Sequence, residues 1–470
     1  MHDLRKQALL ESKKTTSRKA RSRQPTPASS KRTTPVSSRA ASKVRGGSSR
    51  GDSDEENDAE LSDETSFSVG SIDELLNGDA SEPMSEGALA DRIEEIFSRK
   101  GSTIPGREKC YKTYIHYLVT RYSGDGIDGK EEELVAAFLK SIREEDSEKE
   151  TMLAAKAIAI TLTTSPSEDT FEIASNILKR AITDSDSVTV MTATIHALAI
   201  CTFYGGASDE ATLEIMDFLL EIVTSDGNSI SAPDESDPVV AALEEWGFLC
   251  TLVDDMSSQS EESIEAFIEQ LNSAYASVQI AAGENIALLY EKSFKPLDAG
   301  EDSEDYRDED IVSDPLETPG IRPLIRLYPA YRRTDQLLHA LTTRTRTSVS
   351  VHSVSKADRK ALKTSLSDVA QSIEYPHFGP RYSTAIDDNT EMYYGSRMKV
   401  KIHDQGVMTI DKWWKLFRLE ALKRVLQGGF VTHYEDNPTI FETLPILVSA
   451  PDAYKKRMQR PRKVSRAMSG

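Results

Sequence analysis

The chain has 470 residues and a formal net charge of −20, because 77 acidic residues outnumber 57 basic ones. This length is enough for a large core or for two domains. No apolar run approaches the roughly 18 residues that a membrane span requires, and the first residues lack the apolar segment of a secretory signal. We therefore expect a soluble protein of the cytoplasm and the nucleus, with no membrane partner.

Three cysteines, Cys110, Cys201 and Cys250, are widely spaced, and none belongs to a Cys-x-x-Cys pair. Each lies within an apolar pattern of helical period. An odd and scattered set of this kind is typical of an intracellular protein with reduced thiols. We expect all three thiols to be buried.

Residues 1–85 are predicted to form a disordered tail that is first basic and then acidic. The part up to Arg50 is rich in Lys, Arg, Ser, Thr and Pro, whereas residues 52–82 are acidic and contain no Lys or Arg. Low hydrophobicity combined with strong local charge cannot offset the entropy lost on ordering. The tail is either a solvated segment alone, or a nuclear-localisation or nucleic-acid arm and a phosphorylation target.

Ordered structure is expected to begin near Leu89. Apolar residues at helical spacing predict helices over 89–97, 111–122 and 134–142. We interpret these three helices as the capping end of a repeat, because terminal repeats depart from the consensus of the central ones.

Seven helix-sized segments follow between residues 151 and 288, and they alternate between two kinds. Four are rich in Ala and apolar throughout, and they begin at Thr151, Val188, Val239 and Val278. Three are amphipathic, and they begin at Phe171, Leu213 and Ile264, the last running to Tyr275. In both series, the spacing between successive helices is longest where it includes the polar loop 225–237. A period of about 40 residues with two helices per unit is typical of HEAT and armadillo repeats.

The predicted fold class is therefore all-α: a HEAT/armadillo-like α-solenoid over residues 86–293, with a small, mostly helical C-terminal module and disordered charged tails. Small residues on the Ala-rich helices allow close packing, so that neighbouring units bury one continuous core. A helical bundle without repeats is the alternative.

The charge pattern changes twice after the repeats. Residues 294–320 are predicted to be an acidic linker, with the acidic residues concentrated between 298 and 314 and with Pro315 and Pro319 arguing against regular structure. Residues 321–448 form the basic C-terminal module, and residues 449–470 form a basic tail.

The C-terminal module has predicted elements of its own. Helical spacing predicts a short helix over 337–341, a clear helix over 355–372, an amphipathic helix over 410–426 that ends at a C-terminal glycine, and a short helix over 439–444. The alternating segments 391–394 and 398–402 are predicted to be short strands that pair with each other.

Cations gather in three parts of this region: the segment 322–363, the helix 410–426 and the C-terminal tail. In the helix 355–372 they occupy the first two turns, where they oppose the helix dipole, and a bound polyanion would relieve that repulsion. A solvated basic face is the alternative. The candidate RNA- or ribosome-binding residues are Arg344, Arg346, Lys356, Arg359, Lys360, Lys363, Lys412, Lys415, Arg418, Lys455, Lys456, Arg457, Arg460, Arg462 and Lys463.

A set of spaced motifs links the C-terminal module to a known family. In order, the motif residues are Phe378, Gly379, Pro380, Trp413, Gly428, Gly429, His433, Asn437 and Phe441. This order resembles the C-terminal segment of the interferon-related developmental regulator family, whose larger N-terminal part is a helical-repeat region. The chain is identified as a fungal-type member over roughly residues 90–445. The insertion 384–389 and the acidic loop 298–314 depart from the family pattern.

The resemblance implies a non-enzymatic regulator of gene expression. Members are described as transcriptional co-regulators, and the family includes a ribosome-associated translational repressor. The residues agree with this expectation, because the eight histidines are scattered and no phosphate loop or Gly-x-Ser-x-Gly motif is present. We expect no catalytic site, cofactor, metal ion or small-molecule substrate. His433, near Asp436, is read as a structural or RNA-facing residue.

Two functions stay open at this point. In the first, the repeat scaffold binds the ribosome or RNA through basic C-terminal surfaces and represses translation. In the second, the protein is a transcriptional co-regulator that binds protein partners in the groove of the solenoid.

Overall fold

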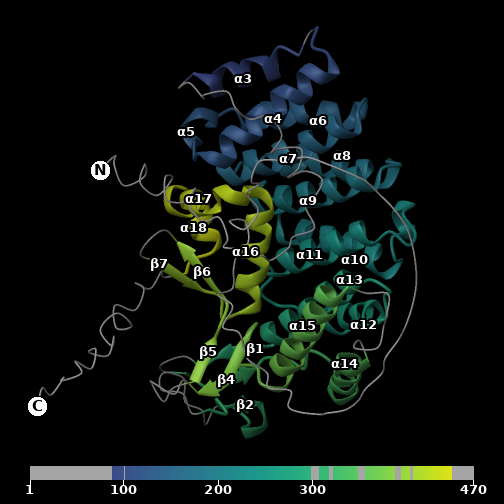
Figure 1. Cartoon of the computed structure of the whole chain (residues 1–470), viewed down its shortest axis with the longest axis vertical. Helices are drawn as coiled ribbons and strands as arrows, with labels where there is room; N and C mark the ends of the chain where they lie inside the picture. Colours follow the sequence, from purple (N-terminus) through teal and green to yellow (C-terminus); the bar gives the residue numbers. More distant parts are fainter. Residues whose placement is uncertain are drawn as a thin grey trace, which may run out of the picture. The chain divides into compact units, whose positions relative to one another are not determined.

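The computed structural model describes residues 87–99, 101–297, 306–316, 321–347, 355–386, 393–402 and 406–446. All of them belong to one compact unit of the chain, residues 66–470. Both predicted tails and the first part of the acidic loop, residues 298–305, lie outside the described residues. Helices make up most of the described part (Figure 1), which confirms the predicted fold class.

The first helices of the described part are α3 (Ala88–Phe97), α4 (Ile104–Thr120), α5 (Gly124–Ile127) and α6 (Glu131–Glu144). The start of α4 has two ordinary causes: Pro105 lies in the first turn, and the hydroxyl of Thr103 accepts a hydrogen bond from the amide of Gly106. α3 packs on α4 and α6, and α4 and α6 both pack on the next helix, as a capping end requires.

The repeat region confirms the two alternating series of helices. Its elements are α7 (Glu148–Thr164), α8 (Thr170–Asp184), α9 (Val188–Tyr204), α10 (Asp209–Thr224), α11 (Ser236–Cys250), α12 (Ser260–Gln270) and α13 (Ala276–Lys292). The Ala-rich inner helices α7, α9, α11 and α13 pack on one another in sequence, and each outer helix packs on an inner one. The third outer helix is shorter than predicted: α12 ends at Gln270, and Tyr275 precedes α13.

The inner helices are buried on nearly all sides, whereas the outer helices bury only one face. Serine caps begin several of them: Ser147, Ser187 and Ser208 each accept a hydrogen bond from the amide three residues later. The three cysteines are free and buried, as expected from the sequence. None of the helices in the described part is long and apolar enough to cross a membrane.

The long step in the repeat is the loop 225–237, which is anchored rather than loose. It contains the short 3-10 helix η1 (Asn228–Ile230), and Ile230 and Ala232 are buried. Gly227 has a positive φ of 78°, and a Cβ there would lie 2.3 Å from the carbonyl oxygen of Ala232. Only glycine fits this turn.

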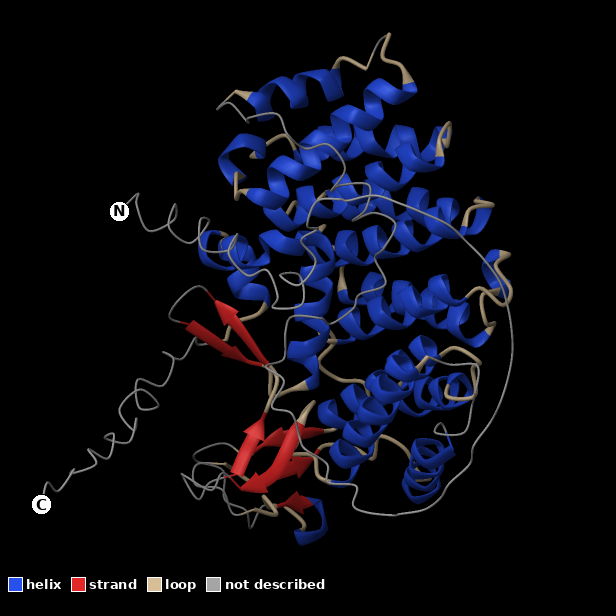
Figure 2. Cartoon of the chain, in the orientation of Figure 1, coloured by secondary structure: helices blue, strands red, loops and turns tan. Residues whose placement is uncertain are grey.

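Strands occur after the repeats, where Figure 2 shows them in red. β1 (Phe294–Pro296), β3 (Leu324–Arg326) and β2 (Ile311–Val312) form a small antiparallel sheet in that order, with Ile325 opposite both Lys295 and Ile311. The 3-10 turn η3 (Asp308–Asp310) precedes β2. The start of the predicted linker and residues 308–312 within it therefore carry regular structure, and β1 and β2 join it to the C-terminal segment through β3.

Two hairpins replace the strand pair predicted from the sequence. β4 (Tyr382–Ile386) pairs with β5 (Tyr393–Ser396), and β6 (Lys399–Ile402) pairs with β7 (Gly406–Thr409). The predicted pairing of segments 391–394 and 398–402 with each other is wrong. Alternation marks a strand but does not identify its partner, and here each segment pairs with a strand on its other side.

The remaining helices are α14 (Thr334–Thr347), α15 (Lys356–Glu374), α16 (Trp413–Leu426), α17 (Phe430–Asp436) and α18 (Pro438–Thr443), with the 3-10 turn η5 (Gln427–Gly429) after α16. α15 packs along α13, and α16 contacts α7, α11 and α13. One hydrophobic core extends from Leu89 to Ile446. The C-terminal segment is thus packed against the repeats and shares their core.

The predicted C-terminal glycine of α16 is wrong in detail. The left-handed residue after the helix is Gln427, with a φ of 48°, and Gly429 has a negative φ of −85°. Gly429 is needed for another reason: a Cβ there would lie 1.7 Å from the carbonyl oxygen of Val119 in α4. The glycine allows η5 to approach the end of α4.

Gly429→Ala is expected to lower the free energy of unfolding by at least about 2 kcal/mol, because two backbone segments must move apart to admit the new methyl group. Gly428→Ala is the matched control, since a Cβ at Gly428 meets no atom within 4 Å. Urea denaturation of the two variants measures the difference. Equal stabilities would contradict the assigned role of Gly429.

Candidate functional site

The C-terminal helix α16 lies across the inner helices of the solenoid. It contacts α7, α11 and α13 (Figure 1), and its residues Leu416, Phe417, Leu422 and Leu426 are buried. Gly247 of α11 allows this approach, because a Cβ there would lie 2.1 Å from the ring of Phe417. The inner face of the repeats, which the co-regulator hypothesis assigns to a protein partner, is occupied in part by the chain itself.

The start of α16 is fixed by a carboxylate from another helix. Glu291, in the last turn of α13, accepts hydrogen bonds from the amides of Trp413 (2.8 Å) and Trp414 (3.0 Å). An anion at a helix N-terminus satisfies amides that have no partner within the helix. The indole of Trp413 donates to Ser372 of α15 at 2.9 Å. The motif residue Trp413 is therefore a buried anchor between α13, α15 and α16.

The last turn of α16 takes part in a buried ion cluster. Arg424 donates to Glu244 at 2.7 Å and to Glu245 at 2.8 Å, and Glu245 is also 2.7 Å from Nδ1 of His196. Burial alone would raise the pKa of Glu245, but Arg424 and His196 outweigh burial and lower it. Three helices, α9, α11 and α16, are tied together by charges that each need their partners.

Two more carboxylates, those of Glu420 and Glu284, lie near Glu244 of this cluster. Burial and the charge of Glu244 raise the pKa of Glu420 to about 7. Burial, Glu420 and Glu244 raise the pKa of Glu284 in α13, whose Oε1 accepts a hydrogen bond from Ser365. Like charges held close to each other disfavour ionisation of both.

Arg418 is one of the candidate RNA-binding residues, but its guanidinium group is occupied inside the protein. It donates to the hydroxyl and the carbonyl oxygen of Thr251 (2.9 and 3.0 Å) and to the carbonyl oxygen of Thr443 (2.9 Å). It also lies over the rings of Phe203 and Trp414, 5.5 and 5.2 Å from their centroids. Arg418 is therefore not part of a solvent-facing binding surface, because its guanidinium group satisfies the Thr251 carbonyl oxygen at the end of α11.

Arg344 has a similar position. In α14 it donates to the carbonyl oxygen of Leu271 and to the side chain of Asn272, both just beyond the end of α12. Burial lowers the pKa of Arg344. This arginine also stabilises a helix end, which removes its guanidinium group from the solvent-facing cations.

The other motif residues hold α17 and α18 to the ends of the repeat helices. His433 is fully buried, and its Nε2 lies 2.7 Å from the carbonyl oxygen of Leu118. Asn437 donates to the carbonyl oxygen of Thr163 at 3.0 Å, and the hydroxyls of Tyr204 and Thr443 are 2.8 Å apart. Burial lowers the pKa of His433, so the imidazole is neutral near pH 7. The structural reading of His433 holds, and the RNA-facing reading is wrong.

The Phe-Gly-Pro turn is also a packing feature. The ring of Phe378 stacks on that of Tyr382, with centroids 4.1 Å apart, and Pro380 is buried. A Cβ on Gly379 would lie 2.0 Å from the carbonyl oxygen of Asp411. Phe441 differs, since it is 44% exposed beside Tyr434.

The cations that remain on the surface lie mainly at the start of α15. Lys356, Lys360 and Lys363 are exposed, while Leu366 and Val369 on another face of the helix are buried. The remaining candidates are less open: Arg359, Lys412 and Lys415 are half-buried, and Lys415 is paired with Asp411. The side chain of Arg346 and the tail residues Lys455, Lys456, Arg457, Arg460, Arg462 and Lys463 lie outside the described residues.

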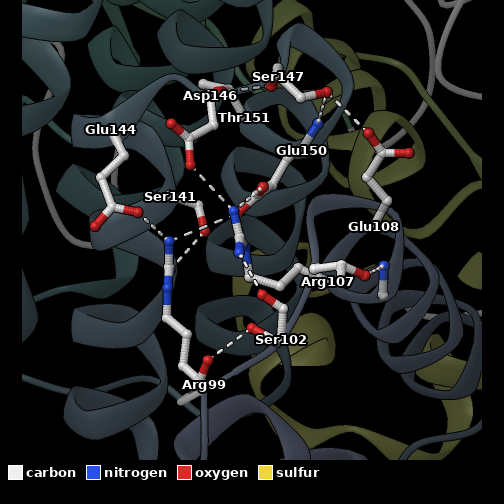
Figure 3. Close-up of polar contacts among 12 residues, drawn as sticks. Arg99, Ser102, Arg107, Glu108, Ser141, Glu144, Asp146, Ser147, Glu150 and Thr151 are labelled. Carbon is white, nitrogen blue, oxygen red and sulfur yellow. Dashed lines mark hydrogen bonds and ion pairs between the residues drawn. The ribbon is translucent and has the colours of Figure 1, made fainter.

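A second polar cluster, at the capping end, is structural (Figure 3). Glu150 of α7 is buried and accepts two hydrogen bonds from Arg107 of α4, at 2.6 and 2.8 Å. Arg99 lies 3.7 Å from the same carboxylate. The adjoining cavity, lined in part by Arg99, Arg107 and Cys110, measures about 10 Å³ and is too small for a ligand larger than water. Within the described ranges, no group of three His, Cys, Asp or Glu side chains is placed to hold a metal ion.

These features define the class of protein: an α-solenoid whose inner helices are clasped by its own C-terminal segment. Residues 51–374 match the interferon-related developmental regulator family, and since this is more than half of the chain, the protein belongs to that family. A protein of Schizosaccharomyces pombe, described as uncharacterized, is 29% identical over 229 residues. The match covers 48% of this chain and 44% of the yeast protein, so it spans less than half the length of that relative.

The family match confirms the family identified from the sequence and supports a regulatory role. It ends at Glu374, the last residue of α15. The motif residues from Phe378 to Phe441 lie beyond it, so the resemblance drawn on them stays a prediction.

Arg424→Met is expected to lower the free energy of unfolding by about 3–5 kcal/mol, because it leaves buried carboxylates without their cation. Adding Glu245→Gln to this variant should restore part of the loss, since the unpaired charge is then removed. Urea denaturation of both single variants and the double variant gives the coupling energy. Additive losses would show that Arg424 and Glu245 do not act as a pair.

A second expectation concerns pH. The folded chain holds a proton on Glu420 up to about pH 7, whereas an ordinary glutamate releases it near 4.5. The free energy of unfolding contributed by this group therefore falls as the pH rises between these values. Glu420→Gln mimics the protonated form. After allowance for partial solvent screening, it should exceed the parent in stability by about 1–2 kcal/mol at pH 8.

The same comparison at pH 5 is the internal control, because both folded chains are then neutral at this position and should differ less in stability than at pH 8. Thermal unfolding at pH 5, 6, 7 and 8 would measure the difference. A difference that does not grow with pH would contradict the raised pKa of Glu420.

Proposed function

We propose that this family member is a non-catalytic regulator of gene expression that binds the ribosome or RNA through its basic C-terminal surface and represses translation. The observation that supports the proposal best is the start of α15. Lys356, Lys360 and Lys363 are exposed there, on a helix fixed to α13 by its buried residues. We define these three lysines as the basic surface. The proposal places the protein in the cytoplasm, with a nuclear pool as a further expectation.

The basic surface suits a phosphate backbone for two reasons. The first turns of a helix carry partial positive charge, to which the three lysines add full charges. Because α15 is anchored along α13, the charges are presented on a rigid element, which lowers the entropy lost on binding. Without a base-reading module, recognition would depend on the shape and charge of a folded RNA.

The alternative, a co-regulator that holds protein partners in the solenoid groove, is less well supported. α16 covers parts of α7, α11 and α13, and its buried charges are already paired. A partner on those inner helices would first have to displace α16 and leave Arg424 and Glu245 unpaired. Protein partners on the outer helices remain compatible with the fold.

Replacing Lys356, Lys360 and Lys363 together by Glu is expected to reduce association with purified eukaryotic ribosomes at least tenfold at low salt. Each lost phosphate contact should also reduce the slope of log affinity against log salt by about 0.7–0.9. Co-sedimentation through sucrose at several salt concentrations measures both quantities. A translation assay with the same variants tests whether loss of binding removes repression.

The matched control replaces three exposed cations at the capping end by Glu, namely Lys109, Lys140 and Arg143. It changes the net charge by the same amount and should bind nearly as well as the parent. Equal loss in both variants would attribute binding to net charge. Full binding by the α15 variant would sink the assignment of this surface.

A further inference from the structure

One half of the solenoid is acidic to an unusual degree. Between Ala181 and Glu291 the chain has 21 acidic residues and no Lys or Arg. Ordinary surfaces mix both signs of charge. These carboxylates therefore find Lys or Arg partners only in other parts of the chain or in another molecule.

Part of this charge, together with two acids that precede it in the chain, is concentrated on one edge of the repeats, where each inner helix ends and the next outer helix begins. The exposed residues there, which we define as the acidic edge, are Glu168, Asp169, Asp209, Glu210, Asp254 and Asp255. Acids in the first turn of an outer helix, such as Asp209 and Glu210, are partly explained by the helix dipole. Glu168, Asp254 and Asp255 lie in the loops before the helices, where that explanation is weaker.

The structure shows that cations from the C-terminal half already bind near this edge. Arg418 donates to the carbonyl and hydroxyl oxygens of Thr251, three residues before Asp254. Arg332, just before α14, pairs with Glu261 of α12 at 3.1 Å, and Arg333 pairs with Glu265. The six residues of the acidic edge have no such cation among the ion pairs of the described residues.

The described chain ends beside the same edge. Thr443 contacts Tyr204 at the end of α9, and its carbonyl oxygen shares Arg418 with Thr251 at the end of α11. Three residues later, the carbonyl oxygen of Ile446 accepts a hydrogen bond from the hydroxyl of Tyr434. Lys455 is nine positions beyond Ile446 in the chain, a reach of up to about 30 Å. Neighbouring packed helices are about 8–10 Å apart, so this reach covers the whole acidic edge.

The segment that follows has the complementary charge. Residues 455–466 contain seven Lys and Arg residues and no acid. We propose that this basic C-terminal segment docks on the acidic edge of its own solenoid when no anionic partner is bound. The docked segment lowers the local negative charge of the repeats and is held by many weak, salt-sensitive pairs rather than by one fixed contact.

Docking has a regulatory consequence, which rests on the proposed function. Phosphate groups of an RNA and the carboxylates of the acidic edge would compete for the same cations. RNA binding would then release the segment from the acidic edge. Conversely, the acidic edge would lower the affinity for RNA, and the more so the greater its negative charge. This competition would disfavour short or weakly charged anions and favour a large polyanion.

The test uses the full chain with a dye on Ser469→Cys. The three native cysteines are buried, so maleimide labels the new thiol selectively. Fluorescence anisotropy at about 50 mM salt reports whether the segment moves freely. The edge variant neutralises the six acids: Glu168→Gln, Asp169→Asn, Asp209→Asn, Glu210→Gln, Asp254→Asn and Asp255→Asn.

The matched control neutralises six exposed acids at the other ends of the same helices: Asp184→Asn, Asp186→Asn, Glu221→Gln, Asp234→Asn, Glu235→Gln and Glu269→Gln. We expect the parent and the control to share a high anisotropy that falls when salt is raised to about 300 mM. The edge variant should show the low value already at 50 mM salt. Circular dichroism melts verify that both variants are folded. Equal anisotropy in all three chains would overturn the proposal.

A second arm separates this inference from the proposed function. Binding of a fluorescein-labelled 20-nucleotide oligouridylate should be at least threefold tighter for the edge variant than for the control, which has the same net charge. If no chain binds the oligonucleotide or ribosomes while the anisotropy differs as expected, docking stands and the proposed function fails. If all bind equally and the anisotropies agree, docking alone fails.

Discussion

The buried ion cluster around Arg424 is the contact on which the arrangement of the C-terminal segment depends. Glu244 and Glu245 of α11 accept from its guanidinium group, and the carboxylate of Glu291 caps the start of α16. Hydrophobic burial alone would tolerate a shift of α16 along the inner helices. A shift by one helical turn would leave charges unpaired in the interior, at several kcal/mol each. The ions therefore fix one register, and apolar burial supplies most of the stability.

How far the sequence predicts this fold depends on the range of the interactions involved. Helical periodicity and N-terminal serine caps are local, so the repeat helices follow from the sequence almost completely. Strand pairing and the packing of the C-terminal segment on the solenoid depend on residues far apart in the sequence. The cation of Arg418 occupies a polar position of an amphipathic helix, and that pattern is the same whether the side chain faces water or, as here, the carbonyl oxygen of Thr251. Periodicity carries no information about which of these the fold supplies.

The motif residues show the same division between pattern and cause. His433, Asn437 and Gly429 belong to the motif that resembles the family. Each meets a backbone carbonyl oxygen of a solenoid helix, at Leu118, at Thr163 or in close approach at Val119. The polar groups of His433 and Asn437 are used in contacts that hold α17 and α18 to the solenoid. A motif whose residues pack the C-terminal segment on the solenoid identifies a fold and does not identify a ligand. The function must therefore be argued from the charges that remain exposed.

A chain of net charge −20 would be expected to repel a polyanion. Salt screens most of this repulsion, since exposed charges more than about 8 Å apart interact weakly at physiological salt. Affinity then depends on the charges close to the contact, and the net charge of the chain matters little. The acids of α12 at Glu261 and Glu265 are already paired with Arg332 and Arg333. Acids elsewhere on the surface repel a polyanion that comes close to them, and they therefore disfavour its approach from any side other than the basic surface.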